Sequence, residues 1–484
     1  MKQTSASAHR KEAFRDHDAS LVGIRPGLPG SVHGALDSLV VTTALPAIGR
    51  ALHARLSDLE WTVNAYALVF TIGMIPATAV GDRLGHRRVL LSGVAIFTLG
   101  SALAALSSSS LMLALSRALQ GVGAACITPL TLTILTRTFP ESQRGLVIGL
   151  WSGIAGLGLT IGPLVGGAVV SGWNWNAVFW MNVPLGILLL VLGRLHLPQS
   201  RGEQRALDLP GGVLIGASLL AIVVGISSGN TAGWRSVRVL GVLVVGVLLL
   251  VAFLRREQRV AAPMIELKLF TVRTFSVANS IGFLMNLGTM GSIFFLTQFM
   301  QNVLAASPLV AGLETMPWTG TIMLVAPLTG WLTKRLGRRA VVLAGMLAQA
   351  AALVWIGALA ATAVPYVSLL PAYVLAGAGM GLALAPVMDA AMSAIAGPQQ
   401  GQASSVLNTV RQLGGVFGIA LLGVVFGLAA PTAGQFLDGF RLAIFVGAGG
   451  LSLGGSLALL LPGRQFPTSI TEPTLAKSSV IPVA

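Results

Sequence analysis

Long apolar segments follow one another along almost the whole chain, and short polar turns separate them. Each segment is close to the roughly 20 residues that a helix needs to cross the hydrocarbon core of a bilayer. Clear candidates are 61–80, 89–106, 111–135, 146–170, 178–192, 210–226, 237–254, 276–299, 309–332, 340–359, 366–392, 404–428 and 441–461. A first span ending at 39–48 brings the total to about fourteen. The pattern predicts an all-α, polytopic membrane protein.

The first span is the least regular of the fourteen. The segment 21–48 contains Pro26 and Pro29 together with Arg25, His33 and Asp37, and only its second half is apolar. Either this helix is broken at its start, or this part of the sequence is abnormal. The pattern alone leaves both possibilities open.

A short motif occurs twice at equivalent places. Asp82–Arg87 (DRLGHR) follows the second span, and Lys334–Arg339 (KRLGRR) follows the tenth. Each motif therefore ends the second helix of a block of six, with two extra helices between the blocks at about 210–254. Tandem six-helix blocks are a transporter architecture in which the substrate site lies between the halves, near the middle of the membrane.

This repeat divides the chain into five parts. We expect an N-terminal tail, a first six-helix bundle, two extra helices with linkers, a second six-helix bundle and a C-terminal tail, at 1–28, 29–195, 196–273, 274–462 and 463–484. The first 20 residues are polar and lack the apolar core of a cleavable signal peptide, which is typical of a cytoplasmic tail.

Composition agrees with a membrane protein and argues against a nucleic-acid-binding one. Hydrophobic residues make up 54% of the chain and charged residues 10%, with a net charge of +15. Soluble domains carry about 25% charged residues. The positive charge matches the Lys and Arg that gather in cytoplasmic loops. Because Cys126 is the only cysteine, no intrachain disulfide is possible.

The basic residues also predict the orientation. Seventeen lie in the turns after even-numbered spans 2 to 10, at residues 83, 87, 88, 137, 144, 194, 201, 205, 255, 256, 259, 268, 273, 334, 335, 338 and 339. Only five lie on the opposite side, at residues 50, 55, 235, 238 and 441. By the positive-inside rule both termini are cytoplasmic, in a multi-pass protein of the cell membrane.

Three acidic residues fall inside apolar segments: Asp37, Glu314 and Asp389. A charge near the bilayer centre costs at least roughly 2.5–3.5 kcal/mol, so such groups usually face a cavity and mark ion or proton pathways. Asp37 and Glu314 lie in the central region, one in each half, and we predict that they exchange protons and attract cations. The alternatives are a structural hydrogen bond for Asp37 and a wetted position at the outer mouth for Glu314.

Two arginines are also placed within spans. Arg117 in the fourth span requires a partner, and beside a carboxyl it would favour proton release from that acid. The alternative is a fixed pair or a clamp on backbone carbonyls. Arg411 and Asp389 both lie near the cytoplasmic side, where we expect them to form a structural ion pair.

The fifth span is rich in small residues. Gly158, Gly162, Gly166 and Gly167 allow close approach of another helix, and Pro163 bends the helix. A bent, smooth helix suits a rocking surface between the two halves.

Nothing in the sequence indicates an enzyme or a bound cofactor. The six histidines form no metal-spaced cluster, no phosphate-binding loop of the ATPase type is present, and no catalytic triad is readable.

Together, these patches resemble the major facilitator superfamily, and specifically its fourteen-helix drug:proton antiporter family. Gly81–Arg88 resembles the loop signature between helices 2 and 3. Matches to the signatures of helices 1, 4 and 5 are Leu36-Asp37-Ser38 with Ala44-Leu45-Pro46, then Arg117, Gln120, Gly121 and Gly123, then Gly158, Gly162, Pro163, Gly166 and Gly167. Further matches are Trp61, Tyr66, Trp175, Phe179, Asn182, Pro184 and Gly186.

The resemblance implies alternating access. It gives Asp37 a role in cation or proton handling and Arg117 a role in proton coupling. The cytoplasmic gating loop would be formed by Asp82, Arg83, Gly85, Arg87 and Arg88. One departure is Thr78, where the loop signature usually has glycine, and it puts tight packing of helix 2 in question.

The favoured function is proton-coupled export of small organic compounds, cationic or amphipathic, by a monomer whose partners are substrate, protons and the bilayer. One alternative is a dedicated exporter of a single metabolite, such as a self-made antibiotic or a siderophore. Uptake by symport is a further alternative. A non-transporting receptor or enzyme is disfavoured, because neither has a physical need for the duplicated halves.

Overall fold

The structure is a computed structural model, and it describes residues 39–200, 208–260, 263–395, 399–430 and 435–462. The described residues form long helices joined by short turns, with no strand among them. Twelve helices are long and apolar enough to cross a membrane. The shorter first helix and α5, whose apolar part is Thr160–Gly172, agree with the predicted total of about fourteen. The all-α polytopic fold is therefore confirmed.

The helix bounds follow the apolar segments closely. The first helix is Leu39–Leu52. The next six are α2 (Leu56–Leu84), α3 (His86–Ala105), α4 (Ser110–Thr138), α5 (Glu141–Gly172), α6 (Trp175–Trp180) and α7 (Asn182–His196). Two extra helices follow, α8 (Leu209–Ala232) and α9 (Val237–Glu257). The last group is α10 (Arg273–Asn302), α11 (Pro308–Leu336), α12 (Arg338–Leu359), α13 (Tyr366–Ser393), α14 (Gln400–Ala429) and α15 (Phe436–Ala458).

The repeated motif forms the same sharp turn in both halves. Gly85 ends α2 with φ of 102°, and Gly337 ends α11 with φ of 85°. Glycine adopts this left-handed region without the steric cost of a Cβ atom. In each half the next helix starts at the following residue, so the sequence repeat is also a structural repeat. We call the end of the bundle that carries these two turns the basic end, and the other the opposite end.

Several helix starts are capped by side chains from the turns. Ser109, Ser236 and Ser307 each accept a hydrogen bond from a backbone N–H in the first turn of α4, α9 and α11. Such caps satisfy N–H groups that have no partner within the helix. Because the caps stand at the ends of the apolar runs, the turns fix the helix lengths.

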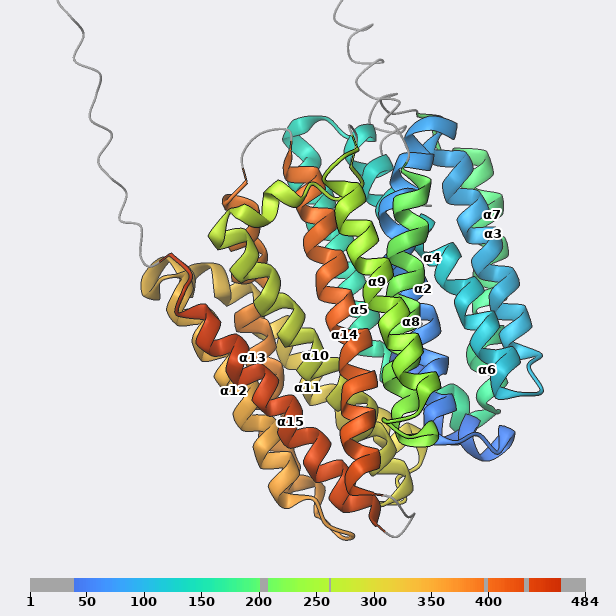
Figure 1. Cartoon of the computed structure of the whole chain (residues 1–484), viewed down its shortest axis with the longest axis vertical. Helices are drawn as coiled ribbons and strands as arrows, with labels where there is room; N and C mark the ends of the chain where they lie inside the picture. The colour runs from blue at the N-terminus through green and yellow to red at the C-terminus, as the bar shows by residue number, and fades with distance from the viewer. Residues whose placement is uncertain (1–38, 201–207, 261–262, 396–398, 431–434, 463–484) are drawn as a thin grey trace, which may run out of the picture.

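Two bundles stand side by side in Figure 1, with α8 and α9 in front of the junction between them. In the first bundle, α4 packs against α2 and α3, and in the second, α12 packs against α13 and α15. The extra helix α8 packs against α9, α2 and α14, so it touches one helix from each bundle. Much of α9 is exposed, with large apolar side chains such as Val237 and Leu248, and this is the surface that a lipid-facing helix presents.

The two bundles meet along α5 with α11 and along α2 with α14. Thr160 and Thr319 donate hydrogen bonds to each other's backbone carbonyls across the first contact, at 3.4 and 3.3 Å. Gln301 in α10 donates to the carbonyl of Thr43 in the first helix at 2.8 Å. These contacts lie between the middle of the helices and the opposite end, so the bundles are joined there.

Candidate functional site

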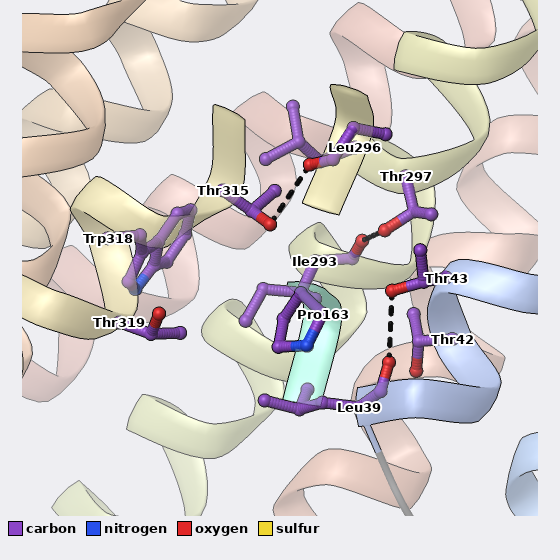
Figure 2. A pocket seen from close by; sticks show the side chains of 11 residues that line it. Leu39, Thr42, Thr43, Pro163, Ile293, Leu296, Thr297, Thr315, Trp318 and Thr319 are labelled. Carbon is purple, nitrogen blue, oxygen red and sulfur yellow. Dashed lines mark hydrogen bonds between the residues drawn. The ribbon is translucent and has the colours of Figure 1, made fainter. Parts of the chain in front are cut away.

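A small pocket, with a cavity volume of about 30 Å³, lies between the two bundles. Figure 2 shows its walls, which come from the first helix, α5, α10 and α11. The lining residues are Leu39, Thr42, Thr43, Pro163, Ile293, Leu296, Thr297, Ala311, Thr315, Trp318 and Thr319. Both bundles contribute, so a molecule held here would touch both halves of the repeat.

The pocket is mainly apolar, and several threonines contribute hydroxyl groups to its wall. Thr43, Thr297 and Thr315 each donate to the carbonyl four residues earlier in the same helix, at 3.2, 3.0 and 3.1 Å. Their hydrogens are therefore engaged, and their oxygen lone pairs can accept from a ligand. No charged side chain lines the pocket among the residues that the structure describes.

Trp318 lines the pocket and carries a hydrogen-bond donor that has no partner among the described residues. This donor is the indole Nε1, and the side chain is only 3% exposed. The ring lies 6.4 Å from the ring of Tyr373, centroid to centroid. An unpaired buried donor is costly in a folded protein. A ligand with an acceptor group would relieve that cost.

The glycines of α5 lie where the helix approaches its neighbours most closely. A Cβ atom on Gly166 would stand 2.8 Å from the carbonyl oxygen of Val40 in the first helix, and one on Gly167 would stand 2.8 Å from Cα of Leu309 in α11. Gly158 and Gly162 are also buried, and Pro163 lines the pocket. Only glycine permits these contacts, so the predicted smooth surface of the fifth span faces both the first helix and the other bundle.

Arg117 is 1% exposed and is held by backbone and side-chain groups. Its Nε donates to the carbonyl of Thr62 in α2 at 3.1 Å, and one terminal nitrogen donates to Gln120 at 2.9 Å. The guanidinium also lies over the Tyr66 ring, 4.3 Å from the centroid. These contacts include the carbonyl clamp that was the alternative expectation for Arg117, and they tie α4 to α2.

The turn at the basic end is a compact polar network. Asp82 lies 3.0 Å from Nε2 of His86 and 3.5 Å from Arg137 at the end of α4. The other ring nitrogen of His86 lies 3.0 Å from Ser200, and Arg87 donates to the carbonyl of Arg194. The turn therefore fastens α2 and α3 to α4 and to the end of α7, while Arg83 and Arg88 are exposed.

Helix 2 keeps its tight packing despite Thr78. The Thr78 hydroxyl donates a hydrogen bond to the carbonyl of Met74 at 3.0 Å. Close approach to α4 is provided instead by Gly73, where a Cβ atom would stand 2.8 Å from Ala125, and by Gly81, where it would stand 2.5 Å from Leu130. The departure from the loop signature is thus compensated by glycines on either side.

Residues 30–419 match the model of the Major Facilitator Superfamily, which is more than half of the chain. The chain belongs to the major facilitator superfamily. It is 36% identical over 397 residues to the tetracenomycin C resistance and export protein of Streptomyces glaucescens, covering 81% of this chain and 73% of that protein. It is 33% identical over 394 residues to the multidrug efflux pump LfrA of Mycolicibacterium smegmatis, covering 81% and 78%.

A third relative and two solved structures extend the comparison. The cephamycin export protein CmcT of Amycolatopsis lactamdurans is 35% identical over 423 residues, covering 85% of this chain and 87% of that protein. The fold is similar to an autoinhibited POT family peptide transporter, with TM-score 0.68, 15% identity and coverage of 94% and 99%. It is also similar to the nucleoside transporter NupG, with TM-score 0.65, 12% identity and coverage of 91% and 99%. Membership of the superfamily makes the chain a transporter rather than an enzyme.

Of the two acids predicted to exchange protons, the structure describes only Glu314. Asp37 lies outside the described residues. Glu314 lies on α11, just before Thr315, and is half-buried but does not line the pocket. Its backbone carbonyl accepts a hydrogen bond from the Tyr366 hydroxyl at 3.0 Å, which joins α11 to α13.

The expected ion pair between Asp389 and Arg411 is not formed. Asp389, whose side chain is 60% exposed, pairs instead with Arg338 at 2.5 Å. Arg411 donates to Asn408 within α14, at 3.3 Å. The reason is geometric. Arg338 starts α12, which packs directly against α13, whereas Arg411 lies on the part of α14 that packs near Gly282 of α10.

Sequence reasoning missed an acid that is well inside the fold. Glu60 in α2 is 5% exposed, and its carboxyl lies against Gly423 of α14, in the other bundle. Glu60 directly precedes Trp61, where the apolar run begins, so hydropathy alone places it in the turn before the helix. Its distance from the start of the helix at Leu56 is the signal that could have found it. The described residues contain no cluster of three or more metal-ligating side chains.

Proposed function

We propose that this superfamily member exports small organic compounds in exchange for protons, by alternating access. One observation carries the proposal: the pocket is built by both bundles, so rocking one bundle against the other would expose it to alternate sides. The relatives named as resistance, efflux and export proteins support the direction of transport.

The orientation follows from the charge of the turns. Because Lys and Arg gather in cytoplasmic loops, the basic end faces the cytoplasm, and both termini lie on that side. The contacts between α5 and α11 then lie toward the external side. The conformation described here is thus the one in which access from outside is closed.

Proton coupling is assigned to the carboxyl groups of Asp37 and Glu314. Asp37 precedes the first pocket-lining residue, Leu39, by two positions, and Glu314 lies beside the pocket residue Thr315. Arg117 would hold α2 and α4 in register as protonation changes, and Asp82 with its neighbours would form the cytoplasmic gating loop. The protein is proposed to act as a monomer, since the pocket and both bundles belong to one chain.

The pocket favours amphipathic substrates. Its walls combine apolar surface, one indole donor and several hydroxyl acceptors, which suits ring systems that carry carbonyl and hydroxyl groups. A dedicated exporter of one antibiotic is the second candidate, and relatives named for single antibiotics favour it. A screen across dye cations and uncharged aromatic antibiotics separates the two.

The deciding experiment is flux in proteoliposomes with an imposed pH gradient, using ethidium and an uncharged aromatic antibiotic as probes. We expect flux that requires the gradient, stops with a protonophore, and is lost in Asp37→Asn while membrane insertion is retained. Flux of both probes indicates multidrug export, and flux of one indicates a dedicated exporter. Gradient-independent flux would exclude antiport, and normal flux by Asp37→Asn would remove Asp37 from the mechanism.

A further inference from the structure

The contact between α2 and α14 contains a carboxyl group that the pocket and the turn do not explain. Glu60 lies one turn inside α2, counted from Leu56, and is 5% exposed. Both of its oxygens contact the position that a Cβ atom would take on Gly423, six residues before the end of α14. The carboxyl thus lies directly in the junction between the two bundles, at the opposite end.

No described group balances a negative charge there. Glu60 forms no ion pair or hydrogen bond with the described residues. Of the charged groups on α4, Arg117 contacts the carbonyl of Thr62, and Arg137 lies at the basic end. Arg411, the charged residue of α14, is twelve positions from Gly423, or roughly 18 Å along the helix.

The remaining neighbours add nothing that would pair with it. The helix α8 contains no charged residue, and the charged residues of α3, which are His86, Arg87 and Arg88, lie at the basic end. On α2 itself, Asp58 accepts from the backbone N–H of Arg55 at 2.9 Å. The exposed arginines of the nearby turns, Arg50, Arg55 and Arg235, form no ion pair with Glu60.

The extra helix α8 holds the backbone of α14 at the level of Gly423. Asn230 near the end of α8 donates to the carbonyl of Val424 at 2.8 Å and to that of Gly423 at 3.4 Å. The Asn230 side chain also fills the space beside Gly427. The extra helices therefore hold α14 where Glu60 meets it, so separation of α2 from α14 would carry the carboxyl from a largely buried contact into water.

We propose that Glu60 is a proton-binding site that links protonation to closure of the junction between α2 and α14. An unpaired carboxylate is costly away from water, whereas a neutral carboxyl is far less so. The closed junction accordingly holds the proton, and an opened, wetted junction releases it. The assignment of this junction to the external side rests on the proposed function.

The link has a direction that can be measured. Protons from outside reach Glu60 when the external side is open, and binding then favours closure. For one linked proton, the closed-to-open ratio changes by up to about tenfold per pH unit. Glu60 differs in this from Glu314, since it acts at the external closure rather than beside the pocket residue Thr315.

The test places spin labels at Ser57 in α2 and Leu428 in α14, in a Cys126→Ala background reconstituted in nanodiscs without substrate. Double electron–electron resonance then gives the distance distribution across the junction. Between pH 8 and pH 5 we expect the short-distance population of the parent protein to grow about tenfold relative to the long one. In Glu60→Gln the short distance should dominate at both pH values.

Two further variants complete the test. Asp58→Asn removes a neighbouring acid of the same helix turn and should respond to pH as the parent does. Glu60→Met replaces the carboxyl by an apolar chain of similar length and should behave like Glu60→Gln, which covers the case that one variant folds poorly. A parent-like pH response in both Glu60 variants would overturn the proposal. Because no flux is measured, loss of the proposed transport function would leave this result interpretable.

Discussion

At the scale of single residues, polar groups in the membrane region are stabilised mainly by backbone carbonyls. Arg117 is bound to Thr62, and the pocket threonines are bound within their own helices. Such bonds do not require a particular partner residue, because any nearby backbone carbonyl can accept. For this reason the sequence predicts which polar side chains lie in the membrane region but does not predict their partners.

Trp318→Phe tests the pocket at this scale. The substitution keeps an aromatic ring but removes the indole N–H, which has no partner among the described residues, together with one of the two fused rings. We expect substrates with an acceptor group to lose about 1 kcal/mol of binding free energy, or about fivefold in KM, because one hydrogen bond is lost. The KM of substrates without an acceptor should change less, because they lose only packing against the missing ring. An equal change for both kinds of substrate would show that Trp318 acts through packing alone.

At the scale of helices, contact is decided by which positions lack a side chain. The glycines of α5 and α11 allow backbone to meet backbone, whereas Glu60 reaches α14 only because position 423 is glycine. The number, order and approximate bounds of the helices were predictable, because twenty-residue apolar runs are constrained by the bilayer. The partner of Asp389 was not, because the choice between Arg338 and Arg411 depends on helix rotation, which hydropathy does not determine.

Gly167→Ala tests the contact between α5 and α11. The added methyl would stand 2.8 Å from Cα of Leu309, and relieving that overlap costs about 1–3 kcal/mol. We expect transport to fall by roughly 30-fold at the middle of this range, since the external closure becomes harder to form. Gly156→Ala on the same helix is the control, because its Cβ would meet nothing within 4 Å. Equal flux in the two variants would contradict the close contact.

The link between the extra helices predicts a dependence on pH. Arg256 donates to Asp208 at 2.7 Å and holds the pKa of that carboxyl below its usual value. A lowered folded-state pKa stabilises the protein above the unfolded value of about 3.9, and this stabilisation is lost as the pH falls through the folded value.

We therefore expect the Tm of purified protein to exceed that of Asp208→Asn at pH 7, by the equivalent of about 0.5 kcal/mol, because the Arg256 side of the pair is exposed to solvent. The two Tm values should converge as the pH is lowered below about 4. Asparagine also caps helix starts well, so the comparison isolates the charge. A Tm difference that persisted unchanged at low pH would show that the charge of Asp208 contributes nothing.

At the scale of the whole molecule, the duplicated architecture was readable from one short motif. Asp82–Arg87 and Lys334–Arg339 gave the two halves, and Gly85 and Gly337 show that the turns are equivalent in three dimensions. The pocket was harder to predict, because it is formed by four helices that are distant in sequence and its polar groups are ordinary threonines. The contact of Glu60 was not predictable, because it depends on Gly423, more than 350 positions further along the chain.

The contact between α5 and α11 is reciprocal. Gly167 of α5 meets the backbone at Pro308, and Gly312 of α11 meets the backbone at Pro163. Each helix thus offers a glycine to a proline of the other. In the repeat α11 corresponds to α2 and α14 to α5, so the contact of α2 with α14 is the equivalent of this one, and the two contacts are related as they are between two identical subunits across a two-fold axis. Two copies of one six-helix chain could make the same contact. The joint that now connects the halves of a single polypeptide therefore has the form of a symmetric dimer interface.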